Sequence, residues 1–123
     1  TYGDFVGYST DGVILKEGVD TFNTFDDADG LIEIKCPEYL EFTRYMDTRD
    51  IKDEHIVQMQ WGMWITGLPY CDYVVYNPDF SNSMMIHRVV SNEKMHDLFK
   101  QRIAMFSEEV EELNKKYKLI ENE

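Results

Sequence analysis

The sequence is poor in cysteine, and its two cysteines show neither a CxxC spacing nor the density of a disulfide framework. Disulfide-rich secreted scaffolds are therefore excluded. Cys36 and Cys71 each stand in an apolar, strand-like context, so we expect both thiols to be reduced and buried. The sequence also has no GxxxxGK loop, no dinucleotide fingerprint and no nucleophile elbow.

Long hydrophobic runs and internal linkers are absent as well. No apolar stretch approaches the roughly 20 residues that cross a bilayer, and the N-terminus lacks a basic-then-apolar signal pattern. No glycine-, serine- or proline-rich stretch and no repeat divides the 123 residues. We therefore expect one soluble, cytoplasmic domain spanning residues 1–123, with no membrane segment and a single hydrophobic core.

Positively charged residues are scarce: the sequence has 12 Lys and Arg but 24 Asp and Glu, so its formal net charge is -12. This balance counts against binding a polyanion, because lysine and arginine supply most of the nonspecific affinity for DNA. A carboxylate metal site, however, would add acids whose charge a bound cation offsets. The acids crowd one loop and one late helix: Asp26, Asp27 and Asp29, and Glu108, Glu109, Glu111 and Glu112. Net charge alone therefore leaves nucleic-acid binding open.

The pattern of apolar residues and breakers predicts strands interrupted twice by helices. In chain order we expect an extended hairpin arm over residues 4–14 with a turn at Asp11-Gly12, a partner strand over 13–16, a strand over 31–36, helices over 38–46 and 53–66, strands over 70–76 and 84–90, and a last helix up to about 118. This order describes an α/β (α+β) fold in which helices flank a central mixed β-sheet.

Capping residues support the two later helices. Gly67 suits the end of the helix over 53–66, and Ser91 or Asn92 can cap the last helix. The last helix carries an amphipathic stripe, and we expect it to pack on the sheet. The stripe consists of Met95, Leu98, Phe99, Ile103, Phe106, Val110 and Leu113.

The strand Leu31-Ile32-Glu33-Ile34-Lys35 carries the first chemical signal. The side-chain period of two places Glu33 and Lys35 on one face. A half-exposed strand with a surface ion pair is one interpretation, and such pairs contribute little. The apolar flanks favour an interior strand instead, where a charged pair needs a reason to be buried.

Asp11 adds a second carboxylate that a hairpin could bring beside Glu33. By itself an Asp-Gly pair is an ordinary turn, so only the combination carries weight. Two carboxylates, water and a nearby lysine form a plausible apparatus for phosphodiester hydrolysis around Mg²⁺, with Mn²⁺ as the alternative metal. Lys35 would orient the attacking water or stabilise the charge that develops on the phosphate.

The order of several motifs resembles the lambda exonuclease and YqaJ-like viral recombinase family, within the PD-(D/E)xK nuclease superfamily. The matching residues cover nearly the whole chain. They are Ser9-Thr10-Asp11-Gly12, Gly30 to Pro37, Gln58-Met59-Gln60, Met63 to Thr66, Tyr76-Asn77-Pro78 and His87 to Val90. The resemblance implies a restriction-endonuclease-like nuclease core.

The resemblance also assigns roles to particular residues. Asp11 and Glu33 would be metal ligands, joined by the backbone carbonyl of Ile34, and Lys35 would be the catalytic lysine. Gln58 matches the family's active-site glutamine; from the residues alone, Gln58 and Gln60 would be solvated helix residues. For Trp61 and Trp64, packing in the core is favoured over base stacking.

Three basic residues between the strand and the following helix are candidates for contacts with DNA phosphates: Arg44, Arg49 and Lys52. Ordinary surface charges are the alternative. His55 and His87 lack the spacing of a zinc site, and we do not predict one.

Two departures from the family are visible. Thr10 stands where the family usually has proline, and the family's N-terminal helical region, which precedes the catalytic hairpin, has no counterpart before Thr1. We expect the chain to be the nuclease catalytic core without that region.

By resemblance, we expect a metal-dependent exonuclease that acts on double-stranded DNA ends, 5′ to 3′, in recombination of a phage or prophage. A homotrimer and a single-strand annealing partner are further expectations. The alternatives are an endonuclease or junction resolvase of the same superfamily, and a catalytically incomplete fragment that binds DNA or serves in assembly.

Overall fold

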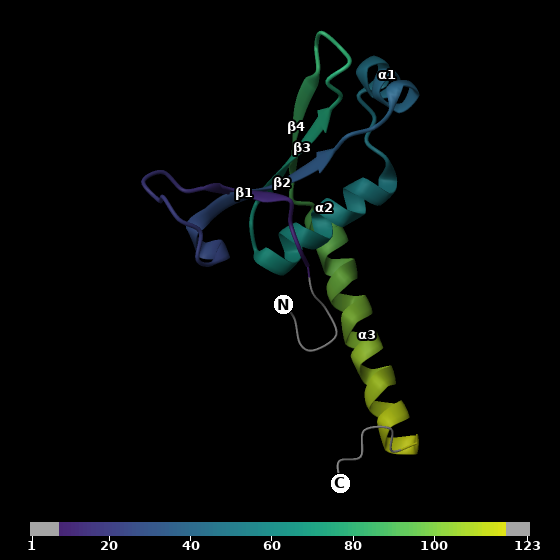
Figure 1. Ribbon diagram of the computed structural model, residues 1–123. Coiled ribbons are helices and arrows are strands. Elements are labelled where there is room, and N and C mark those ends of the chain that lie inside the picture. Colours follow the sequence, from purple (N-terminus) through teal and green to yellow (C-terminus); the bar gives the residue numbers. More distant parts are fainter. Residues whose placement is uncertain (1–7, 118–123) are drawn as a thin grey trace.

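The computed structural model describes residues 8–117, and in this part of the chain a mixed four-stranded sheet is combined with three helices (Figure 1). The elements in chain order are β1 (Gly12–Leu15), the 3-10 turn η1 (Phe25–Asp27), β2 (Ala28–Lys35), α1 (Tyr39–Thr48), α2 (Asp53–Thr66), β3 (Tyr70–Tyr76), β4 (Met84–Val90) and α3 (Glu93–Tyr117). The sheet order is β1-β2-β3-β4, with β2 and β3 parallel and the other pairs antiparallel. The predicted α/β (α+β) class with a mixed sheet is confirmed.

The first strand differs from the prediction. Asp11-Gly12 is not a hairpin turn, because β1 begins at Gly12 and pairs with β2, with Gly12 opposite Ile32. The Asp11 side chain binds the backbone of β2, and this tertiary contact overrides the turn preference of the Asp-Gly pair. Residues 4–7 of the expected arm lie outside the described residues.

The core lies between the sheet and the helices α1 and α2. β2 is an interior strand, as its apolar flanks predicted, and its residue Leu31 pairs with Cys71 of β3. Both side chains are fully buried, together with Phe42 of α1 and Met59 of α2. The alternating pattern of β2 and β3 therefore directs one face of the sheet to the helices.

The helix α3 corrects a second prediction. Asn92 caps it, since the Met95 N–H donates to Asn92 Oδ1 at 3.1 Å. However, α3 packs mainly against α2 and extends away from the sheet (Figure 1). Its Phe99 ring lies 5.2 Å from Trp61 and 5.8 Å from Trp64, measured between centroids. Met59 and Met63 of α2 already fill the helix-facing side of the sheet, which leaves α3 to pack on α2. The tryptophans therefore serve helix packing.

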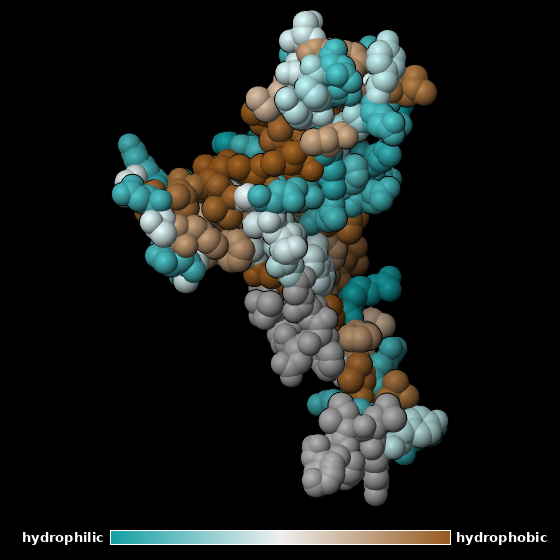
Figure 2. Space-filling model, viewed as in Figure 1, coloured by the Kyte–Doolittle hydropathy of each residue, from teal (hydrophilic) through white to brown (hydrophobic). Residues whose placement is uncertain are grey.

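The opposite face of the sheet exposes apolar side chains. Ile34, Met84, Ile86 and Val90 are 45 to 66% exposed, and Figure 2 shows hydrophobic surface in the region of the sheet and along α3. Within residues 8–117, no helix is long and apolar enough to span a membrane.

The two cysteines differ from each other. Cys71 is buried, as predicted, but the prediction for Cys36 is wrong, because this residue is exposed. Cys36 follows the last residue of β2, at the point where the chain leaves the sheet.

Substitutions on the two faces of the sheet should separate in stability. Leu31→Ala removes a fully buried side chain and should lower the free energy of unfolding by about 2 to 5 kcal/mol. Ile86→Ala, on the exposed face, should cost less than about 1 kcal/mol. Urea unfolding followed by circular dichroism measures both, and equal losses would contradict the assignment of the two faces.

Candidate active site

The carboxylate of Asp11 lies against the end of β2. Its Oδ2 accepts a hydrogen bond from the Ile34 N–H at 2.8 Å. Thr10 also fastens this segment, because its hydroxyl lies within hydrogen-bond distance of two carbonyl oxygens, that of Gly12 at 2.8 Å and that of Ile32 at 3.2 Å.

Glu33 and Lys35 project from β2 toward the helices. The Lys35 Nζ lies 3.3 Å from Glu33 Oε2 and donates to Gln58 Oε1 of α2 at 3.2 Å. Glu33 is only 7% exposed, so the interpretation as a surface ion pair is wrong. Of the predicted catalytic set, the structure brings Glu33, Lys35 and Gln58 into contact, and it places Asp11 against the backbone of Ile34, between Glu33 and Lys35 in the sequence.

Gln60 and Gln58 have different surroundings although they are two residues apart. Gln58 is exposed and contacts Lys35, whereas Gln60 is 3% exposed. The Gln60 amide donates to the carbonyl of Val90 at 2.8 Å, and its oxygen accepts the Asn92 N–H at 2.8 Å. The interpretation of Gln60 as a solvated residue is therefore wrong, since its side chain ties α2 to the junction of β4 and α3.

The two carboxylates act on the same buried groups. Burial, and after it the charges of Glu33, Asp72 and Asp11, raise the pKa of the Cys71 thiol to about 12. The pKa of Tyr8 is also raised to about 12, mainly by burial and further by both carboxylates. The buried carboxylate of Glu33 and the exposed carboxylate of Asp11 thus act on the same groups, an arrangement that a nearby cation stabilises.

The donor set fits a hard divalent cation. Asp11 and Glu33 offer carboxylate oxygens, and the carbonyl of Ile34 faces the same edge of β2 as its N–H, beyond Gly12, where β1 begins. Among residues 8–117, no group of three or more His, Cys, Asp and Glu side chains converges. Mg²⁺ is commonly held by one or two carboxylates and keeps several waters, so a site with two carboxylates suits it.

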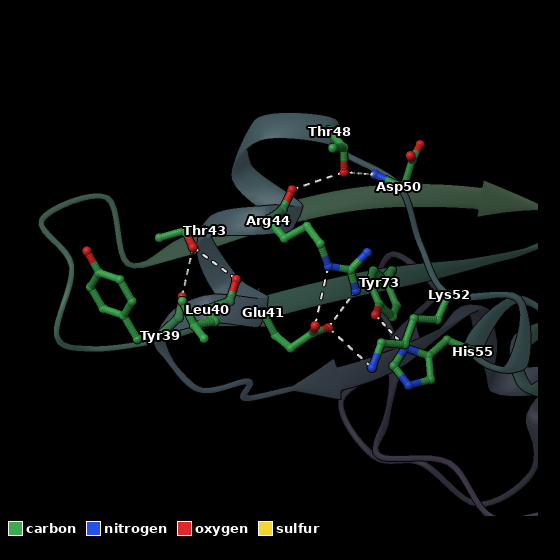
Figure 3. Close-up of polar contacts among 10 residues, drawn as sticks. All are labelled: Tyr39, Leu40, Glu41, Thr43, Arg44, Thr48, Asp50, Lys52, His55 and Tyr73. Atoms are coloured by element: carbon green, nitrogen blue, oxygen red, sulfur yellow. Dashed lines mark hydrogen bonds and ion pairs between the residues drawn. The ribbon is translucent and has the colours of Figure 1, made fainter.

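The three basic candidates do not form one cluster. Arg44 and Lys52 both pair with Glu41, at 2.7 and 3.2 Å, beside the catalytic strand (Figure 3). Arg49 instead adopts the left-handed conformation at the end of α1 and contacts the sulfur of Met85 on β4. Glu41 was missed by sequence reasoning, although its spacing of three from Arg44 on a helix was a usable signal.

Two hollows open on either side of Lys35. The smaller one, of ≈ 80 Å³, is lined by residues that include Lys35, Glu41, Arg44, Lys52, His55 and Tyr73. The larger one, of ≈ 430 Å³, is lined by Lys35, Glu54, His55, Val57, Gln58 and Trp61. Lys35, the predicted catalytic lysine, therefore borders both hollows.

Comparison with solved structures places the fold among nucleases. The chain is similar to LHK-Exo, an alkaline exonuclease from Laribacter hongkongensis, with 27% identity and a TM-score of 0.60 over 88% of this chain and 61% of that one. It is also similar to LHK-Exo in complex with dAMP, with 29% identity and a TM-score of 0.60 over 73% of this chain and 51% of that one. The chain thus spans 51 to 61% of the length of these structures. No curated protein sequence is similar enough to add to this comparison.

A family profile provides the decisive match. The YqaJ-like viral recombinase domain matches residues 2–69, which include Asp11, Glu33, Lys35 and Gln58 and make up more than half of the 123 residues. The chain therefore belongs to the YqaJ-like viral recombinase family.

Proposed function

We propose that this chain is the catalytic core of a Mg²⁺-dependent nuclease that hydrolyses phosphodiester bonds of double-stranded DNA. The observation that carries the proposal is the joint placement of two carboxylates and a lysine at one end of β2, where Asp11 binds the Ile34 N–H and Lys35 lies 3.3 Å from Glu33. Family membership and the likeness to an alkaline exonuclease support the same reaction class.

Asp11, Glu33 and the carbonyl of Ile34 would hold the cation. When bound, Mg²⁺ supplies Lewis-acid polarisation of the phosphate and lowers the pKa of a coordinated water. Lys35 is held in a fixed position, because its ammonium group forms an ion pair with Glu33 and donates a hydrogen bond to Gln58. Its charge can therefore orient the attacking water and stabilise the negative charge that grows on the phosphate oxygens.

We further propose that the substrate is a DNA end, degraded 5′ to 3′ during recombination of phage type. The similar structure is that of an alkaline exonuclease, which supports the choice of an end over an internal site. A trimer around the duplex and a single-strand annealing partner belong to the same proposal. Small-angle scattering that shows a monomer at all concentrations would contradict the trimer.

Activity should depend on both the metal and Lys35. Linear duplex DNA with a 5′-phosphate should be degraded in the presence of Mg²⁺ and remain intact in EDTA. Lys35→Ala should reduce the rate by at least about 100-fold, because a positioned donor in the site is lost. Release of acid-soluble nucleotides measures the rate.

Lys100→Ala is the matched control, since Lys100 lies on the exposed surface of α3 and should leave the rate unchanged. Closed circular DNA should resist the enzyme. Cutting of the circle would favour an endonuclease, and an inactive wild type that still binds Mg²⁺ would indicate an incomplete enzyme.

Metal binding can be tested without activity. Mg²⁺ should raise the melting temperature of the wild type, because a ligand that binds only the folded state stabilises it. Asp11→Asn and Glu33→Gln keep the size of each side chain but remove a carboxylate, so the Mg²⁺-dependent increase should shrink or vanish. Thermal melts with and without MgCl₂ provide the measurement, and an unchanged increase in both variants would place the metal elsewhere.

A further inference from the structure

A hydrogen bond joins α2 to the sheet beside the proposed catalytic lysine. The Nδ1 of His55 lies 2.7 Å from the hydroxyl oxygen of Tyr73 (Figure 3). Tyr73 is 5% exposed and pairs in register with Glu33 on the neighbouring strand. A side chain of α2 is thus held by a rigid residue that lies next to a proposed metal ligand.

His55 occupies the boundary between the two hollows. His55 and Lys35 line both of them. The hollow that contains Gln58 and Trp61 has a volume of ≈ 430 Å³, within the range of ligand sites, whereas the other has only ≈ 80 Å³. A DNA strand whose nucleotide enters the larger hollow would therefore pass the imidazole of His55 on its way to Lys35.

The Tyr73 contact selects one tautomer of the imidazole. The Tyr73 phenol keeps its proton, because burial, assisted by Tyr45 and Glu33, raises its pKa to about 12. If the His55 Nδ1 carried the hydrogen, the phenol hydrogen would lack an acceptor in a buried place, which is unfavourable. The phenol therefore donates to Nδ1, and the hydrogen of the neutral imidazole stands on Nε2.

The electrostatic surroundings keep the ring neutral. Burial and then the charge of Lys35 lower the pKa of His55, with Lys52 acting in the same direction and Glu54 in the opposite one. Within residues 8–117, no side chain hydrogen-bonds to His55 Nε2, and Figure 3 shows this nitrogen on the side of the ring away from Tyr73. The Nε2–H is thus an available donor beside Lys35.

We propose that His55 contacts the substrate, donating its Nε2–H to a phosphate oxygen of the bound strand, and that Tyr73 is the positioning residue that holds the imidazole in this orientation. The proposal rests on the nuclease function proposed above. It adds a neutral donor to the charged ammonium of Lys35, so that two groups on different elements grip the same strand.

Steady-state kinetics on linear duplex DNA with Mg²⁺ test the proposal. His55→Ala should lower kcat/KM by about 10- to 100-fold, the value of a hydrogen bond to a charged group. His55→Gln places an amide N–H near the position of Nε2 and should recover most of the activity, whereas His55→Asn places it near Nδ1 and should not. A purely structural role of His55, exerted through the contact of Nδ1 with Tyr73, would instead make Asn at least as good as Gln.

The role of Tyr73 is tested by Tyr73→Phe, which keeps the packed ring and removes only the hydroxyl. This variant should lower kcat/KM less than His55→Ala does, and in the His55→Ala background it should have no further effect, because the hydroxyl would act only through the imidazole. Melting temperatures accompany each assay, so that a folding defect is recognised.

His87→Ala is the matched control, because His87 lies opposite Tyr73 on β4 but lines neither hollow at Lys35. It should retain the wild-type kcat and KM. The proposal is overturned if His55→Ala is fully active, or if Gln and Asn at position 55 behave alike, while Lys35→Ala is inactive in the same assay. An inactive wild type, or an active Lys35→Ala, would instead count against the nuclease function itself.

Discussion

The hydrogen bonding along the two edges of β2 sets the position of both acids in the site. On one edge, β1 begins only at Gly12, which lies opposite Ile32. The next backbone N–H of β2 that points toward this edge is that of Ile34, and it has no partner on β1. The Asp11 carboxylate takes this donor at 2.8 Å. On the other edge the parallel pairing with β3 places Tyr73 beside Glu33. The end of a strand normally leaves backbone N–H and C=O groups without partners. Here the Asp11 carboxylate is the partner of such an N–H group, and this contact positions the first acid of the site.

The site is built at some cost to stability. A carboxylate such as Glu33, nearly buried and close to a second acid, is unfavourable unless positive charge lies nearby. Lys35 supplies one positive charge, but Gln58 shares its ammonium group. The pKa values of Tyr8 and Cys71 are raised chiefly by burial, and both acids act in the same direction. In the proposed function, a divalent cation held by Asp11 and Glu33 would offset this negative charge.

Local patterns in the sequence predicted what local physics decides. The period of two placed Glu33 and Lys35 on one face, and the bounds of α2, β3 and β4 follow from helix caps and breakers such as Gly67. Predictions failed where a distant partner decides. Asp11-Gly12 is not a turn because β2 binds Asp11, Gln60 is buried because β4 and α3 need its amide, and α3 lies on α2 because Met59 and Met63 occupy the sheet. The contact of His55 with Tyr73 joins residues 18 positions apart, and no spacing rule in the sequence marks it.

The connection from β1 to β2 has a consequence for how such sites vary. Asp11 and Glu33 are brought together by strand register, while the residues between Leu15 and Ala28 form an exposed loop that contains Gly18 at φ 85° and the turn η1. The entropic cost of closing a loop grows only slowly with its length. The number of residues between the two acids is therefore free to change while their geometry stays the same. A sequence motif that fixes the number of residues between Asp11 and Glu33 would therefore overlook proteins that have the same site but a loop of another length. The tip of this loop is also a position where a peptide label can be inserted.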